Sequence, residues 1–397
     1  TLVKTKGSES NQWLLIKSGE DLKPVSKVQD DKSILTGRTM ARIALDRDAQ
    51  WKPKSSTPKK PAKTRKRSEG KELKFIDPMK ATLVDAPPTK GEWLYEVKFD
   101  GYRALALKSG GNVQLLSRNE KDFALRFPEI TEAIARLPAD NVIIDGEIVA
   151  MDSQGRPSFQ LLQAFQLGTE RPALAFYLFD LLHCEGNDLT AEPLHERRRQ
   201  LELLSKGLAE PVRFSASLSG EPQRLLEEVS RLGLEGVIGK ERNSPYQGGQ
   251  RTKTWIKLKC VREQEFVIGG YTPPDGARKH FGALLLGVFE GAKLRFVGKA
   301  GTGFNSAILR SLHRAMKEIE QGNCPFDDLP EKKAGRWSQN ITPAEMKLCH
   351  WVRPDLVCQI RFTEWTNDGK LRHPVFLGLR EDKDPRDVVR ETPSKIR

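Results

Sequence analysis

The sequence is poor in cysteine and has no long apolar run. Its 397 residues include only 5 cysteines, none of them in a CxxC pair, so zinc-ligand spacing is absent and reduced thiols in a cytosolic compartment are expected. Cys349, His350 and Cys358 lie close together in sequence, but we expect buried strand residues there rather than zinc ligands. No run of about 18 apolar residues occurs, which excludes a transmembrane helix. The polar start, TLVKTKGSESNQ, is unlike a signal peptide and has no initiator Met, which indicates a piece of a longer protein.

Acidic residues are fewer than basic ones. The 66 Lys and Arg against 53 Asp and Glu give a formal charge of +13. This excess favours a polyanionic partner, with nucleic acid ahead of an anionic membrane surface, although solubility alone is the alternative explanation. Residues 51–73 are rich in Lys, Arg, Pro and Ser and almost free of apolar side chains, which predicts a disordered basic linker.

Apolar runs of strand length divide the rest of the chain. Over residues 74–262 they alternate with helical patterns at 128–137, 193–204 and 222–234, which predicts an α+β domain with antiparallel sheets. Over residues 263–390 strands dominate around one helical pattern at 306–320, as in a five-stranded OB-fold barrel. Residues 1–50 hold only a strand-like run, WLLI, and a helix-like run, Thr39 to Ala44, which are too little to fold alone.

The stretch EVKFDGYR, residues 96–103, contains the first candidate site. Lys98 and Asp100 point to one face of a strand end, and Gly101 allows a turn or the close approach of a ligand. A lysine nucleophile must lose its proton, which requires burial or nearby cations. The alternative is an ion pair between Lys98 and Asp100 on an exposed face.

Three carboxylates lie within apolar strand-like runs: Asp145, Glu147 and Glu235. A carboxylate in such surroundings is costly unless it is paired or binds a metal, and together they could converge on Mg²⁺. Asp145 and Gly146 could instead form a hairpin turn.

Aromatic and basic side chains lie in the same runs. Phe176 and Phe179 could form a wall on which adenine stacks, or the core, and we expect the core for one of them. Arg103 and Arg118 could clamp phosphate.

Taken in order, these motifs resemble those of the covalent nucleotidyltransferases and, among them, the ATP-dependent DNA ligases. They are KxDG at 98–101, SRN at 117–119, DGE at 145–147, FYLFD at 176–180, EG at 235–236, KxK at 257–259 and RHPVFLGLREDK at 372–383. KxDG alone is weak, but the ordered set is specific. KFIDPMKATLVD and EFVIGGYTPP resemble the bacterial ligase D type, and residues 1–50 resemble the tail of its phosphoesterase domain. The histidine-rich part of that domain is absent, so its activity is not expected here.

The resemblance implies a fold and a mechanism: an adenylation domain followed by an OB-fold. Lys98 would attack the α-phosphorus of ATP and hold AMP, which would pass to a DNA 5′-phosphate before the neighbouring 3′-OH displaces it. The other implied contacts are Glu96, the Val97 backbone and Phe179 at adenine; Arg103, Arg118 and Glu147 at ribose and phosphate; Glu147 and Glu235 at Mg²⁺ or Mn²⁺; Lys257 and Lys259 at phosphate, where they also depress the pKa of Lys98; and Arg372, Arg380 and Lys383 at pyrophosphate.

The resemblance also implies partners and rivals. The expected substrate is nicked or broken double-stranded DNA. The enzyme is expected to be a monomer in a bacterial cytoplasm, at the nucleoid and not at a membrane. A Ku-type end-binding protein is a candidate partner. A mobile hinge is expected at 260–263. An RNA-capping guanylyltransferase shares KxDG and would label with GTP rather than ATP. A non-catalytic DNA-binding scaffold would still support end joining after Lys98→Ala.

Overall fold

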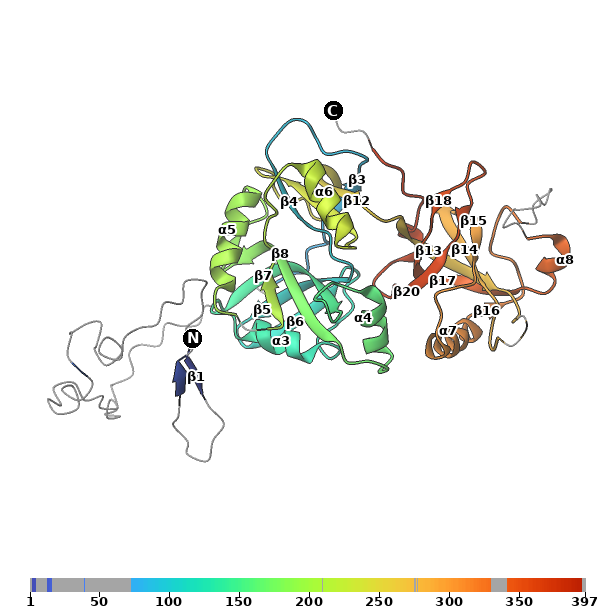
Figure 1. Cartoon of the computed structure of the whole chain (residues 1–397), viewed down its shortest axis with the longest axis horizontal. Helices are drawn as coiled ribbons and strands as arrows, with labels where there is room; N and C mark the ends of the chain where they lie inside the picture. Colours follow the sequence, from blue (N-terminus) through green and yellow to red (C-terminus); the bar gives the residue numbers. More distant parts are fainter. Residues whose placement is uncertain are drawn as a thin grey trace. The chain divides into compact units, whose positions relative to one another are not determined.

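The structure is a computed structural model that describes residues 2–4, 13–15, 39, 73–208, 210–274, 276, 278–329 and 341–394. The chain divides into two compact units, residues 1–68 and 69–397 (Figure 1). In the first unit, β1 (Leu2–Lys4) pairs antiparallel with β2 (Trp13–Leu15). Apart from Thr39, the expected helix from Thr39 to Ala44 lies outside the described residues, and so do residues 51–72 of the expected linker.

The second unit begins with what we call the α+β region, residues 73–262. Its larger sheet has the strand order β10–β8–β7–β5–β6, with β9 paired to β8. All neighbours are antiparallel except β10 and β8. The strands are β5 (Tyr102–Ser109), β6 (Asn112–Ser117), β7 (Asn141–Met151), β8 (Ala173–Cys184), β9 (Asn187–Asp188) and β10 (Val212–Phe214).

A smaller sheet has the order β3–β12–β11–β4. Its strands are β3 (Lys80–Leu83), β4 (Trp93–Val97), β11 (Gly236–Glu241) and β12 (Arg251–Lys259). Val97 pairs with Val237, and Gly236 pairs with Lys259. This register brings the KxDG, EG and KxK motifs, which are far apart in sequence, to the same end of the sheet, where β4 and β12 finish and β11 begins.

Helices α3 (Pro128–Ala135), α5 (Leu194–Ser205) and α6 (Pro222–Arg231) confirm the three predicted from the apolar periodicity. A fourth, α4 (Phe159–Gln166), was not predicted. Its N-cap is Ser158, whose side chain accepts from the Leu161 backbone N–H. Phe159 and Leu162 bury its apolar face in the core of the larger sheet.

The barrel region, residues 263–394, forms the second half of the unit. Strands β15 (Lys293–Ala300), β14 (Leu284–Glu290), β13 (Glu263–Tyr271) and β17 (His350–Arg361) are neighbours in that order, and β20 (Val375–Leu379) pairs with β17. A bridge between Thr302 and Val375 closes the ring, as expected for an OB-fold. The smaller elements are β16 (Glu320–Gln321), β18 (Glu364–Trp365), β19 (Leu371–Arg372), α8 (Pro343–Met346) and the 3₁₀ turn η1 (Pro385–Asp387).

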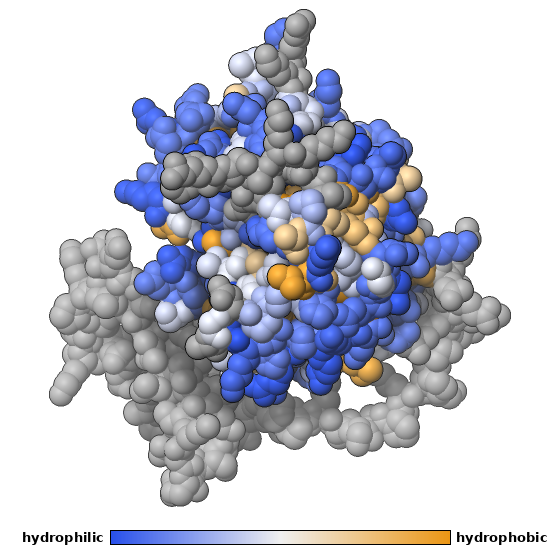
Figure 2. All heavy atoms as spheres, turned by 90° about the vertical axis from the view of Figure 1, so that its right-hand side faces the viewer, coloured by the Kyte–Doolittle hydropathy of each residue, from blue (hydrophilic) through white to orange (hydrophobic). Residues whose placement is uncertain are grey.

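Helix α7 (Ser306–Glu318) packs Leu312 and Met316 into the barrel core. Figure 2 views the molecule from the barrel side, where the coloured surface is mostly hydrophilic with a small apolar patch. Most large apolar side chains of this region lie inside the barrel.

All five cysteines are free. Cys358 is buried in β17 as expected, whereas Cys349 is only half-buried and precedes that strand. Among the described residues no helix is long and apolar enough to cross a membrane, and no three His, Cys, Asp or Glu side chains are already arranged to hold a metal ion.

Candidate active site

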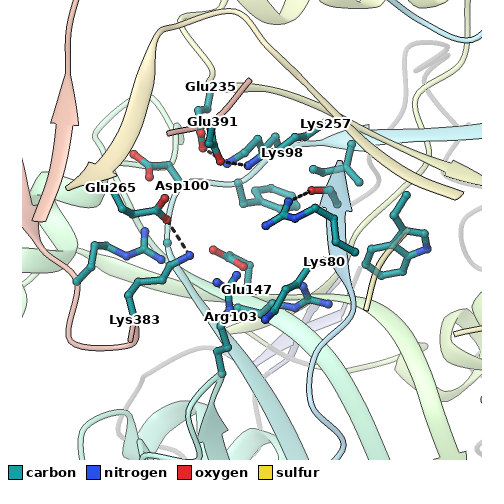
Figure 3. A pocket seen from close by; sticks show the side chains of 18 of the residues that line it. Lys80, Lys98, Asp100, Arg103, Glu147, Glu235, Lys257, Glu265, Lys383 and Glu391 are labelled. Atoms are coloured by element: carbon teal, nitrogen blue, oxygen red, sulfur yellow. Dashed lines mark hydrogen bonds and ion pairs between the residues drawn. The ribbon is translucent and has the colours of Figure 1, made fainter. Parts of the chain in front are cut away.

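A cavity of about 540 Å³ lies between the α+β region and the barrel region, within the range typical of small-molecule sites. Figure 3 shows its charged side chains pointing into a common hollow. Every site residue expected from the sequence lines it except Arg372. From the α+β region these are Glu96, Val97, Lys98, Arg103, Arg118, Glu147, Phe179, Glu235, Lys257 and Lys259, and from the barrel region Arg380 and Lys383.

Lys98 directly follows β4, and its backbone N–H extends the pairing to the Gly236 carbonyl at 2.8 Å. Its side chain forms an ion pair with Glu235 rather than with Asp100. On the opposite face, Phe99 stacks on Tyr177 with ring centroids 4.0 Å apart. The alternative of an exposed Lys98–Asp100 pair is therefore wrong, because both side chains line the cavity.

The pKa of Lys98 differs in sign from the expectation. Burial opposes its charge, but Glu235, then Asp100 and Glu147, outweigh burial and raise the pKa. Lys257 and Lys259 do not depress it in this state. The single carboxylate of Glu391 pairs with both and offsets part of their charge, so activation of Lys98 requires a change in the charges around it.

Lys257 and Lys259 project from alternate positions of β12, so they share one face. Both form ion pairs with Glu391 from the C-terminal segment, the Lys259 pair at 2.8 Å. Burial, and then the charge of Lys259, lower the pKa of Lys257 to about 8. The two lysines hold the pKa of the Glu391 carboxyl at about 2 against the effect of burial. An anion already occupies this lysine pair, which marks it as an anion site.

Carboxylates form another side of the cavity. Burial raises the pKa of Glu147 to about 7, and burial together with Glu235 and Glu263 raises that of Asp100 to about 8. Glu263, which lies outside the cavity lining, has one carboxylate oxygen that is buried without a partner among the described residues. Such an oxygen-only donor set fits a hard divalent cation, whose charge would relieve the clustering.

Asp145 does not form a hairpin turn, because it lies within β7 and is fully buried. Its carboxylate accepts from the Arg103 guanidinium at 2.9 and 2.6 Å and from the Tyr246 hydroxyl at 2.7 Å. A Cβ at Gly146 would come within 2.5 Å of the Phe176 ring. Gly146 is therefore required by the close packing of β7 against β8, and the DG pair does not indicate a turn here.

Arg103 is held by that carboxylate and lies 5.5 Å from the Phe179 ring centroid. Arg118 lies beside it, half-buried, and its Nε has no partner among the described residues. Burial, and then the charge of Arg103, lower the pKa of Arg118. Of the two arginines, Arg118 is the one with an unused donor for an anionic ligand.

The aromatic end of the cavity contains Phe179, whereas Phe176 is fully buried in the core. Lys240 lies 4.4 Å above the Phe179 ring and 4.3 Å from the Trp255 ring. The Glu96 carboxylate accepts from Arg198 at 2.8 Å and from Ser215 at 2.7 Å, and pairs with Lys240 at 2.8 Å. Three partners leave about one of its four acceptor positions free.

The barrel region contributes Arg380 and Lys383. Arg380 is bound by Asp382 through two hydrogen bonds of 2.9 and 2.8 Å, and Lys383 pairs with Glu265 at 2.7 Å. Burial, and then the charge of Arg118, lower the pKa of Lys383 to about 8. Lys383 faces Lys257 of β12 across the hollow (Figure 3).

Arg372 is the exception, and the structure corrects its expected place. It lies in β19, where Leu371 is buried and the side chain of Arg372 is 59% exposed and pairs with Glu364 at 2.7 Å. Strand alternation turns it away from the barrel core, and it does not line the cavity.

Sequence reasoning also missed several lining residues. Asp100, which the sequence analysis expects on the same face as Lys98 but without a role of its own, does line the cavity. Glu265 opens the EFVIGGYTPP run but was given no role, and Glu391 is a single acid outside any motif. Trp255 had a signal, because it lies two residues before Lys257 and shares its strand. Lys80, Lys240 and Asp387 also line the cavity, and the sequence analysis assigns them no role.

Comparisons with known proteins identify the family of the chain. A family model described as "ATP dependent DNA ligase domain" matches residues 78–259, and one described as "ATP dependent DNA ligase C terminal region" matches 277–383. The chain is 41% identical to the multifunctional non-homologous end joining protein LigD of Pseudomonas aeruginosa, over 99% of this chain and 46% of that protein. It therefore spans about half the length of that relative.

Two further known proteins are matched over almost their whole length. DNA ligase C of Mycobacterium tuberculosis is 31% identical over 78% of this chain and 91% of that protein. The solved structure of mycobacterial DNA ligase D complexed with ATP and MES aligns with a TM-score of 0.59 and 33% identity, over 80% of this chain and all of that one. The chain belongs to the family of ATP-dependent DNA ligases.

Proposed function

We propose that this chain seals 5′-phosphate/3′-OH breaks in double-stranded DNA through a lysyl-AMP intermediate at Lys98. The observation that carries the proposal is the placement of Lys98 in a cavity of about 540 Å³ that is lined by carboxylates and by four basic side chains, Lys257, Lys259, Arg380 and Lys383. A nucleophile, an anion site and an aromatic wall then face one bound nucleotide.

Adenine would lie against Phe179, with its exocyclic amine donating to the free acceptor position of Glu96. Guanine carries a carbonyl at that place, and an acceptor facing a carboxylate is repelled. Arg118 would bind phosphate or ribose through its unused donor. The triphosphate would replace the Glu391 carboxylate on Lys257 and Lys259 and extend towards Arg380 and Lys383.

The metal proposal rests on the oxygen-only donor set of Glu147 and Glu235. When bound, Mg²⁺ or Mn²⁺ would neutralise these carboxylates and the phosphate oxygens and so lower the pKa of Lys98. Lys98 would lose its proton through its hydrogen-bond partner Glu235. Its nitrogen would then bond to the α-phosphorus as the bond to pyrophosphate breaks. Lys257 and Lys259 would stabilise the charge of the phosphates during transfer.

In the second step the DNA 5′-phosphate would attack the α-phosphorus and release Lys98. In the third, the 3′-OH would displace AMP and close the strand. The barrel region covers the cavity, so DNA can reach the adenylate only after that cover is withdrawn, and residues 260–263 between β12 and β13 are the natural hinge.

The role in the cell follows from the relative named as an end-joining protein. We infer action as a monomer on double-strand breaks at the nucleoid, with a Ku-type protein to hold the ends. Joining of a linear plasmid with and without such a protein would test this.

The first experiment is self-labelling. Protein stripped of bound AMP with pyrophosphate is incubated with α-labelled ATP or GTP and Mg²⁺ or Mn²⁺, then denatured beside Lys98→Ala. Label from ATP that survives denaturation and is lost in the variant supports the proposal. Label from GTP would favour a capping enzyme, and no label from either would favour a DNA-binding scaffold.

A further inference from the structure

The α+β region and the barrel region meet at a contact outside the nucleotide cavity. Gln163 of α4 is buried, with 8% of its surface exposed. Its side-chain oxygen accepts from the Leu379 backbone N–H at 3.1 Å, and its side-chain nitrogen donates to the Leu379 carbonyl at 3.0 Å. The Gln163 amide thus pairs with both backbone groups of one residue of β20, as a residue of a neighbouring strand would.

The barrel side of this contact is shaped to receive the helix. A Cβ added at Gly378 would come within 2.4 Å of the Gln163 side chain and within 2.7 Å of the Phe159 ring. Only glycine permits this approach, since neither obstacle is the free end of a flexible chain. The backbone of Gly378 does not lie in the left-handed region, so its need for glycine comes from the contact with α4.

The contact lies one residue from the barrel's part of the cavity. Leu379 ends β20 and Arg380 follows it. The Arg380 guanidinium lies 4.9 Å from the Phe159 ring and 5.7 Å from the Tyr102 ring. Tyr102 also accepts a hydrogen bond from Gln163. Side chains of the α+β region therefore fix both the backbone before Arg380 and its guanidinium.

We propose that Gln163 is a positioning residue that docks β20 through Leu379 and thereby places Arg380 and Lys383 in the nucleotide cavity. The proposal rests on the proposed function. It makes Gln163 important for lysyl-AMP formation, which uses the closed cavity, and not for sealing, which needs the cover withdrawn. The ion pair of Arg126 and Glu381, which also crosses this boundary, is far more exposed: the two side chains are 3.0 Å apart and 38% and 48% exposed.

The test uses one variant from each side of the contact between α4 and β20. Gln163→Met keeps the volume and removes both hydrogen bonds to Leu379, together with those to Tyr102 and Gln166, while Gly378→Ala adds the obstructing methyl group. The loss of the two buried hydrogen bonds also deprives the Leu379 N–H and carbonyl of their Gln163 partners. We therefore expect a decrease of about tenfold or more in the rate of self-adenylylation at saturating ATP. Sealing of a chemically pre-adenylylated nick should stay within about twofold of wild type. Matched controls are Gln223→Met on exposed α6 and Gly322→Ala, where a Cβ would meet nothing within 4 Å.

A double-mutant cycle separates positioning from general stability. In an Arg380→Ala background, Gln163→Met should lower the self-adenylylation rate much less than it does alone, because the group that it positions is gone. Equal losses in self-adenylylation and sealing, additive effects in the cycle, or wild-type labelling by both variants would overturn the proposal. Wild-type protein that forms no lysyl adenylate would instead overturn the proposed function on which it rests.

Discussion

The two walls of the cavity are built differently. On the α+β side, charged residues are held by partners in the same region, as Arg103 is by Asp145 and Glu96 is by Arg198 and Lys240. On the barrel side, Arg380 and Lys383 also have partners in their own region, Asp382 and Glu265, but their place in the cavity depends on contacts that cross between regions: Gln163 with Leu379, and Glu391 with Lys257 and Lys259. The first wall can persist when the regions separate, whereas the second exists only while they are together. This difference suits a site that is closed for one chemical step and open for the next.

The largest effect that sharpens this comparison is expected for Arg380→Ala. In the proposed function Arg380 contacts the pyrophosphate only in the closed state, so its loss should slow self-adenylylation by about 100-fold or more. Sealing of pre-adenylylated DNA should change far less. Both rates are measured with the same protein preparation, and equal losses would sink the assigned role.

Glu96→Gln probes the α+β wall through its internal network. The change leaves the buried cations Arg198 and Lys240 without a compensating charge, and breaking such a buried network costs about 3 kcal/mol of the free energy of unfolding. It also replaces an acceptor near adenine, so the preference for ATP over GTP should fall. Urea denaturation and paired labelling measure the two effects, and unchanged stability would contradict the view of a self-supporting wall.

The pH dependence of ATP binding tests both walls together. The pKa values of Lys257 and Lys383 are both lowered to about 8. Below pH 8 each lysine carries the positive charge that binds phosphate. Above pH 8 each lysine is mostly neutral and must take up a proton when ATP binds. The half-saturating ATP concentration should therefore rise, by up to about tenfold per pH unit for each lysine. The rate at saturating ATP should rise over the same range, because Lys98 must lose a proton.

Labelling rates across a series of ATP concentrations between about pH 7 and pH 9 would separate these trends. Lys257→Arg keeps its charge throughout, so it should flatten the rise in half-saturating ATP. A half-saturating concentration independent of pH in the wild-type protein would show that neither lysine pKa lies in this range.

Glu391→Gln tests the contact in which the C-terminal segment occupies the lysine pair. Its carboxylate competes with the triphosphate for Lys257 and Lys259, so the variant should bind ATP several-fold more tightly and release AMP faster when pyrophosphate is added. Asp387→Asn is the matched control, because Asp387 lies in the same segment and its side chain is 56% exposed, 3.6 Å from Lys80. Weaker ATP binding in Glu391→Gln alone would mean that Glu391 supports the closed state instead of competing.

The sequence predicted the α+β wall well because each of its functional residues lies in a short motif on a strand. Adjacent strands bring such motifs together, so Lys98, Glu235 and Lys259 converge once β4, β11 and β12 pair. The barrel wall depends on the docking of two regions, which no local pattern encodes. Glu391 is one acid in a polar tail, and Gln163 lies in α4, a glutamine-rich helix of 8 residues whose apolar pattern is too short to predict.

Arg372→Ala is expected to have the smallest effect and is the sharpest test of which motif residues form the barrel wall. Arg372 opens the motif that ends in Arg380 and Lys383, yet its side chain is 59% exposed and pairs with Glu364. An exposed pair contributes less than about 1 kcal/mol to stability, and a side chain outside the cavity cannot contact pyrophosphate there. Self-adenylylation should stay within about twofold of wild type. A loss as large as that of Arg380→Ala would show that β18 and β19 rearrange when ATP binds, so that the barrel wall would be still more dependent on the closed state.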